Sequence, residues 1–127
     1  MRQVITALIA MTCLVFLAWE PTQAQQPKTV TVGFRNRTDS NVLVKGYTVV
    51  NGTQRVGQLM QLRKSGGMAF ENSVLAGVRF VTVYDAITTR VLLRDFPVPI
   101  QNRDISFDIV PAPLPGQPTR ITLVPIP

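Results

Sequence analysis

Residues 78–84 constrain the fold more than any other stretch, because they are the densest run of β-branched and aromatic residues outside the N-terminal segment. Side chains alternate between the two faces of a strand, so Phe80 and Tyr84 share one face. Val81 and Val83 share the other. A strand that is apolar on both faces is typical of a sheet interior that is covered on both sides. We therefore expect residues 78–84 to form the central strand of a small all-β domain.

Strand-like alternation of apolar and polar residues recurs along the rest of the chain. It predicts further strands over residues 28–35, 42–50, 53–62, 68–72, 90–95, 105–110 and 119–124. Short strands at this spacing indicate a small antiparallel β-sandwich, immunoglobulin-like, with about seven or eight strands. A small β-barrel is the alternative. Pro97 and Pro99 each remove a backbone donor, which excludes their segment from the interior of a sheet.

Three local features make sharper predictions. Asn51-Gly52 between two strand-like runs predicts a type I′ hairpin turn, because that turn needs positive φ at both central positions. The alternation slips near Gly46, where a glycine predicts a β-bulge. In the short strand over residues 68–72, we expect Phe70 to face the core.

The N-terminal segment has the layout of a secretory signal peptide. Arg2 supplies a positive charge, residues 4–19 are mostly apolar, and Thr-Gln-Ala at 22–24 places small side chains before a cleavage point. We expect residues 1–24 to be removed, which leaves 103 of the 127 residues as a single domain, residues 25–127. The apolar run is close to the lower length limit for a spanning helix, so an uncleaved anchor is the alternative. After cleavage no membrane span is expected.

Cysteine and histidine content limits both location and chemistry. The only cysteine, Cys13, lies in the signal segment, and the chain has no histidine. A small exported domain without disulfides suggests a bacterial periplasmic or extracellular protein. The same absences exclude Cys–His nucleophiles, Ser-His-Asp triads and His/Cys zinc sites. We therefore expect no catalytic residues, no metal and no cofactor, with a carboxylate-only enzyme as a remaining alternative that would have to use Asp39, Glu71, Asp85, Asp95, Asp104 or Asp108.

Basic residues near turns are the first candidates for ligand binding. The net charge is +6, and it stays +6 when Arg2 and Glu20 leave with the signal. Arginine favours bidentate contact with carboxylate or phosphate. Consecutive backbone N–H groups in the glycine turn at 65–67 could form an anion-binding nest beside basic side chains. The predicted ligand-binding residues are Arg35, Arg37, Arg63 and Lys64.

Two other features are compatible with binding. Tyr47, Phe80 and Tyr84 would stack on sugars if they lay on an open sheet face. The proline-rich residues 111–118 read as an extended connector of polyproline character, which could dock in a partner's aromatic groove.

The function expected from these features is binding without catalysis. The hypothesis is an exported β-sandwich domain that binds an anionic cell-envelope component or another envelope protein. A carbohydrate-binding module is the second hypothesis, and a structural accessory protein the third. A nucleic-acid partner is not expected, and no motif is specific enough to indicate a family.

Overall fold

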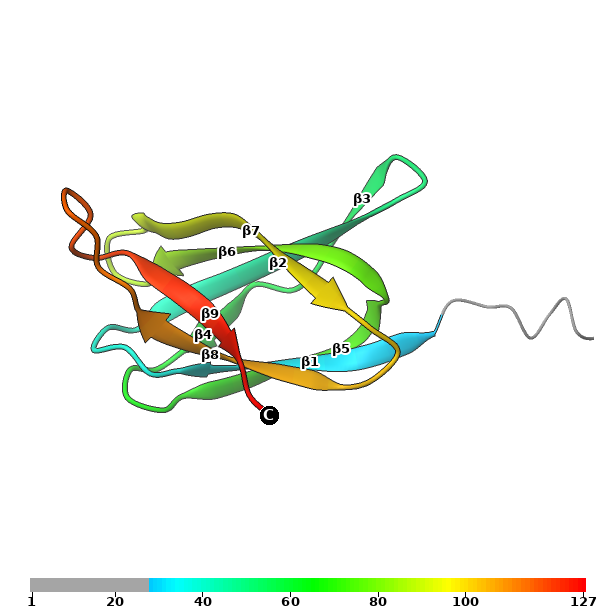
Figure 1. Ribbon diagram of the computed structural model, residues 1–127, viewed down its shortest axis with the longest axis horizontal. Helices are drawn as coiled ribbons and strands as arrows, with labels where there is room; N and C mark the ends of the chain where they lie inside the picture. Colours follow the sequence, from blue (N-terminus) through cyan, green and yellow to red (C-terminus); the bar gives the residue numbers. More distant parts are fainter. Residues whose placement is uncertain (1–27) are drawn as a thin grey trace, which may run out of the picture.

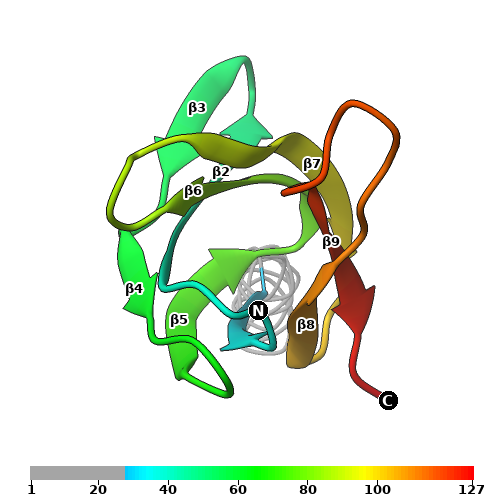
Figure 2. The ribbon, with the colours of Figure 1, turned by 90° about the vertical axis from the view of Figure 1, so that its left-hand side faces the viewer.

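The computed structural model describes residues 28–127, which fold into two β-sheets packed face to face (Figure 1). The first, here called the β1 sheet, has the strand order β5 (Met68–Leu75), β1 (Thr29–Asn36), β8 (Ile105–Pro111), β9 (Ile121–Pro125). The second, the β6 sheet, has the order β3 (Thr53–Val56), β2 (Val42–Val50), β6 (Gly77–Asp85), β7 (Val91–Ile100), and β4 (Met60–Leu62) also pairs with β2. Viewed end-on, the two sheets enclose the core between them (Figure 2). The predicted all-β sandwich is therefore confirmed, and the described strands do not close into a barrel.

The strand count and the connections differ in detail from the expectation. The described residues form nine strands, because the single strand predicted over residues 53–62 divides into β3 and β4. Strands β1 and β8 pair in parallel, whereas the other strand pairs are antiparallel. Strands β1 and β2 also lie in different sheets, whereas the first two strands of an immunoglobulin domain share one. The likeness to that fold is thus in the two-sheet layout and not in the connections.

The strand predicted to be central is β6, which pairs with β2 on one side and β7 on the other. Val81 and Val83 are fully buried between the sheets. Phe80 and Tyr84 lie on the opposite face and are partly exposed, because the described residues supply no third layer above the β6 sheet. The prediction of an interior strand is confirmed, and the prediction that both of its faces are covered is wrong.

The core consists of the inward side chains of both sheets. Val32 and Phe34 of β1 face inward with Ile109 of β8, and Phe34 stacks on Phe107 with ring centroids 6.0 Å apart. Burying a side chain of this size stabilises the fold by roughly 1.5–3 kcal/mol relative to leaving it exposed. Strand β7 carries the two prolines predicted to avoid a sheet interior, and it is an edge strand.

The β2–β3 hairpin turns as predicted, but the irregularity expected near Lys45-Gly46 lies in the partner segment opposite these residues and not in β2 itself. Asn51 has φ of 51° and Gly52 has φ of 78°, as a type I′ turn requires. The pairing of β2 with β6 runs through Gly46 without a shift in register. The irregularity lies instead on the other side of β2, where residues 57–59 separate β3 from β4. Gly46 has a different role, since a Cβ there would lie 2.6 Å from Nε of Arg79.

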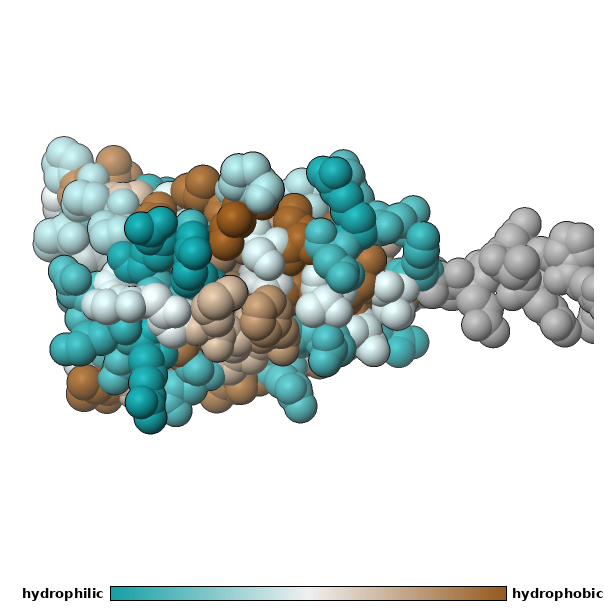
Figure 3. Space-filling view, turned by 90° about the horizontal axis from the view of Figure 1, so that it is seen from below, coloured by the Kyte–Doolittle hydropathy of each residue, from teal (hydrophilic) through white to brown (hydrophobic). Residues whose placement is uncertain are grey.

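Phe70 faces outward, so the prediction that it enters the core is wrong. Its side chain is 55% exposed and covers Gly33 on the neighbouring strand, where a Cβ would lie 2.8 Å from the ring. An aromatic ring fills the space above a strand glycine in this way. Figure 3 looks onto this outer face of the β1 sheet, where weakly hydrophobic side chains occupy the centre and hydrophilic ones flank them. The inward neighbour of Phe70 on β5 is Glu71.

The proline-rich connector is not fully extended. Leu114 and Gln117 form an isolated bridge with two backbone hydrogen bonds of 3.1 and 2.8 Å. Gly116 between them has φ of 78°. The segment therefore folds back into a tight loop, which corrects the expectation of a polyproline connector.

The predicted signal peptide, residues 1–24, lies outside the described residues. Within residues 28–127, no helix is suited to span a bilayer.

Candidate binding sites

A cavity of about 670 Å³ lies between β3 and β5, which are outer strands of opposite sheets. Its walls come from β3, from the 57–58 segment that follows it, from β5 and from the start of β6. Buried polar side chains of both sheets reach this cavity, namely Thr48, Glu71 and Arg79.

The buried polar group is an ion pair that joins the two sheets. Glu71 comes from β5 of the β1 sheet and Arg79 from β6, and their side chains are 9% and 5% exposed. Arg79 donates one hydrogen bond from Nη2 to Oε1 of Glu71 and another, of 3.0 Å, from Nη1 to Oγ1 of Thr48. The backbone N–H of Gln58 donates to Oε2 of Glu71 at 3.0 Å. Both carboxylate oxygens therefore accept a hydrogen bond, one from Arg79 of β6 and one from the segment between β3 and β4.

Two glycines make room for this pair. Gly46 lies directly against the guanidinium, and a side chain at Gly57 would collide with Glu71 and Arg79. The Gly57 N–H donates to the Gly46 carbonyl at 2.8 Å, which fixes the 57–58 segment over the pair. The backbone of this segment thus packs over the ion pair, and the segment and the pair both line the cavity.

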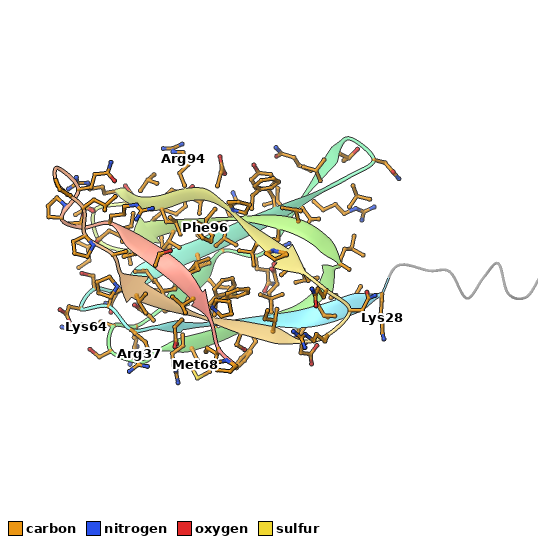
Figure 4. The ribbon with its side chains drawn as sticks, in the orientation of Figure 1. Lys28, Arg37, Lys64, Met68, Arg94 and Phe96 are labelled. Atoms are coloured by element: carbon orange, nitrogen blue, oxygen red, sulfur yellow. The ribbon has the colours of Figure 1, made fainter. Side chains whose placement is uncertain are left out.

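The four predicted ligand-binding residues gather at one end of the sandwich, but they differ in ion pairing and in exposure. Arg35 donates from Nε and Nη2 to the two carboxylate oxygens of Asp108 at 2.6 and 2.9 Å. Arg37 is 3.9 Å from the same carboxylate, and its side chain is 59% exposed. Arg63 and Lys64 are exposed in the turn between β4 and β5. Figure 4 shows Arg37 and Lys64 at the same end, opposite to Lys28.

The backbone of the glycine turn is already used within the protein. The N–H groups of Ser65, Gly66 and Gly67 donate to carbonyls at 3.0, 2.6 and 3.1 Å, and that of Lys64 donates to Oδ1 of Asn41 at 2.8 Å. These four N–H groups are therefore not free to form an anion-binding nest. A shallow hollow of about 400 Å³ remains, lined by Arg35, Arg37, Ser65 and Gly66.

Asn36 holds this end of the molecule together. Its buried amide donates to the carbonyls of Ser40 and Leu62, and its oxygen accepts from the N–H and hydroxyl of Thr38. The Gly66 N–H also donates to the Asn36 carbonyl. The loop after β1 and the turn after β4 are thus tied to each other, which holds the backbone of Arg37 and Lys64 in place.

Two carboxylates at this end, Asp85 and Asp108, have lowered pKa values, so they favour the ionised form. The hydrogen bond from Arg35 lowers the pKa of Asp108, and the same contact raises the pKa of Arg35. Backbone N–H groups of Thr88 and Ile87 lower the pKa of Asp85 by donating to it in a turn. Neither shift is in the direction that a general acid at neutral pH requires. Residues 28–127 contain no group of three acidic, histidine or cysteine side chains that could hold a metal ion.

The predicted aromatic residues Tyr47, Phe80 and Tyr84 share the outer face of the β6 sheet, and two of them pack against each other. Tyr47 and Phe80 stack on each other with centroids 5.2 Å apart and 26° between the ring planes. Phe80 stands opposite Pro97 across the strands, and Tyr47 stands opposite Val56. Burial, with Asp95 as a smaller contributor, raises the pKa of Tyr47. Tyr47 and Phe80 therefore each cover one ring face of the other, which leaves less ring surface for stacking on a sugar.

The ion pair was not predicted from the sequence, although one signal for it was present. Arg79 shares its parity with Val81 and Val83, so it lies on the buried face of the central strand. A charged side chain at such a position needs a partner. Glu71 could not be identified as that partner, because β5 and β6 lie in different sheets.

No protein-family model matches the chain, and no curated protein matches it significantly.

Proposed function

We propose that the protein is an exported, non-enzymatic binding domain whose ligand is an anionic polymer of the cell envelope. Arg37, Arg63 and Lys64 would form the contact surface. The observation that carries the proposal is that these exposed side chains project from two turns tied together by backbone hydrogen bonds. Preorganised cations attract a polyanion at a smaller cost in lost side-chain and loop freedom.

The local charge balance supports the same surface. Arg35 neutralises Asp108 with two hydrogen bonds, so Arg37, which is 59% exposed and 3.9 Å from the same carboxylate, adds an excess positive charge beside that pair. Arg90 and Arg120 line an adjacent hollow, together with Asp39 and Asp85. The excess positive charge of this end is therefore centred on Arg37, Arg63 and Lys64.

Export is part of the proposal because of the N-terminal sequence. The charged start, the apolar run and the small residues at 22–24 are what a secretory signal needs. A periplasmic or extracellular location would bring the basic end into contact with envelope polymers. N-terminal sequencing of the secreted protein should find Gln25 as the first residue. Finding Met1 instead would favour the alternative that the N-terminal segment is retained as an anchor.

The binding test compares two variants of equal charge change. Affinity for purified lipopolysaccharide should fall with added salt and should fall further in Arg63→Ala/Lys64→Ala, because screening and charge removal weaken the same contacts. The control is Arg94→Ala/Arg103→Ala, in which both exposed arginines lie away from the basic end (Figure 4 shows Arg94 on β7). An equal loss in the control would mean that net charge alone attracts the polymer. No binding to the polymer at low salt would reject an anionic ligand in favour of a protein partner or a structural role.

A further inference from the structure

The cavity between β3 and β5 has the size of a small-molecule site. Its volume of about 670 Å³ falls within the range of roughly 300–1,000 Å³ that is usual for ligand pockets. It is separate from the basic end, since Arg37, Arg63 and Lys64 take no part in its walls. The walls combine buried polar groups, exposed polar side chains such as Asn72, and exposed apolar ones such as Val56.

The ion pair at this cavity has unused hydrogen-bonding capacity. A guanidinium carries five N–H donors, and Arg79 makes two hydrogen bonds, to Glu71 and Thr48. A carboxylate has about four acceptor positions, and Glu71 accepts two hydrogen bonds, from Arg79 and the Gln58 N–H. A donor-rich group and an acceptor-rich group thus lie side by side at the cavity wall. A hydroxyl group is complementary to both, because it accepts from one and donates to the other.

The charge of the cavity indicates a neutral ligand. Arg79 and Glu71 neutralise each other, so the buried wall has no net charge. Arg55 adds one positive charge from the exposed strand β3. An anion would meet this one uncompensated charge on an exposed strand, where solvent and salt screen it, whereas a ligand that presents hydroxyl groups beside C–H surface would match both kinds of wall.

The burial of this pair also calls for an explanation beyond stability. Replacing a buried ion pair by apolar side chains of similar volume is often neutral or stabilising by about 1–4 kcal/mol. The protein instead places Glu71 and Arg79 against an open cavity and leaves glycines at 46 and 57 to accommodate them. From these contacts we propose that the cavity is a saccharide-binding site, in which Arg79 and Glu71 bind neighbouring hydroxyl groups of a neutral sugar.

Arg55 offers a test that leaves the ion pair intact. Arg55 stands opposite the inward-facing Thr48 in the β2–β3 pairing, so its side chain lies on the cavity side of β3. Its neighbour Gln54 stands opposite the exposed Val49, on the other face. Arg55→Trp should fill the cavity, and Gln54→Trp is the matched control because it adds the same ring to the same strand outside the cavity. Both positions are exposed in a strand, where tryptophan is well tolerated.

The probes are cellobiose, maltose and N,N′-diacetylchitobiose, titrated against the labelled domain and followed by amide chemical shifts. At least one disaccharide should shift the signals of Gln58, Glu71 and Arg79, with an affinity that does not change with salt. Arg55→Trp should weaken that binding by about tenfold or more, equivalent to roughly 1.4 kcal/mol, and Gln54→Trp should not change it. Equal weakening in both variants, or shifts confined to other residues, would overturn the proposal. Binding of an extended acetylated (Val-Thr)₄ peptide at these residues without any disaccharide would also overturn it, and would identify the free edges of β3 and β5 as a peptide site.

Discussion

Within residues 28–127, two hydrogen-bonded arginine–carboxylate pairs have similar chemistry and different surroundings. Arg79 and Glu71 join the two sheets and are almost completely removed from water. Arg35 and Asp108 stand side by side on β1 and β8 of a single sheet, with side chains 34% and 15% exposed. The second pair has the better geometry, with two parallel hydrogen bonds.

Burial, more than geometry, decides how much stability is lost when one member of each pair is removed. Water already reaches the outer pair of Arg35 and Asp108, so losing one partner leaves the other partly hydrated and costs less. In the buried pair, the partner left behind would keep its charge without solvent or counter-charge. The comparison predicts a large penalty for breaking the inner pair and a small one for breaking the outer pair.

The largest effect is expected from Arg79→Ala. The change should destabilise the fold by about 3–5 kcal/mol, because it leaves the Glu71 carboxylate buried and unpaired. Urea unfolding of the variant and of the wild type gives the difference directly. A loss as small as that of an exposed pair would mean that water enters the cavity and solvates Glu71 freely.

Replacing both members of the inner pair should not destabilise the fold. In Glu71→Leu/Arg79→Met no charge remains buried, so stability should be unchanged or higher by up to about 4 kcal/mol. The same protein should lose disaccharide binding, because both hydrogen-bonding groups are gone. A double variant as unstable as Arg79→Ala would show that the pair stabilises the fold beyond neutralising itself.

Acid should destabilise the protein through the outer pair and the β6–β7 turn. The pKa values of Asp108 and Asp85 are lowered in the folded state, so their stabilising contribution is complete above the unfolded pKa of about 3.9. It is lost as the pH falls through the folded pKa values. Between about pH 6 and pH 8 the urea midpoint should be flat, because residues 28–127 contain no histidine or thiol. A steep change in that interval would reveal another carboxylate with a raised pKa.

The smallest effect is expected from Asp108→Asn at neutral pH. Arg35 remains partly exposed and can be solvated, so the urea midpoint should move by only a small fraction of the shift in Arg79→Ala. The variant should also lose less stability than the wild type when the pH is lowered. That difference would be the contribution of Asp108. A loss comparable to that of Arg79→Ala would remove the distinction between the two pairs.

Much of the fold was predictable because it depends on local patterns. Strand β2 occupies the predicted residues 42–50, and the Asn51-Gly52 turn has the expected backbone. Alternation also placed Val81 and Val83 on one face of β6, the face that Arg79 shares in the structure. The outward position of Phe70 was not predictable, because a phenylalanine fits either face until its neighbour across the strands is known to be Gly33.

For the candidate sites too, some features were predictable from the sequence and others were not. The arginines and Lys64 could be singled out as basic residues near turns, and the structure brings Arg37 and Lys64 to one end. The sequence could not show that Arg35 pairs with Asp108, because the two residues lie 73 positions apart. The cavity between β3 and β5 had no sequence signature, since it exists only where outer strands of two sheets face each other.

By itself, the sequence determined most of the strand pattern, which side chains share each face of β6, and the hairpin turn. Its composition also excluded chemistry that depends on histidine. These follow from side-chain alternation, backbone preference and composition, which act over a few residues. Tertiary structure alone decided which charges meet and which become buried: Glu71 with Arg79 inside, Asp108 with Arg35 outside. The reason is physical, since the cost of a charge depends on the water that distant strands leave around it, and that is set only when the two sheets pack.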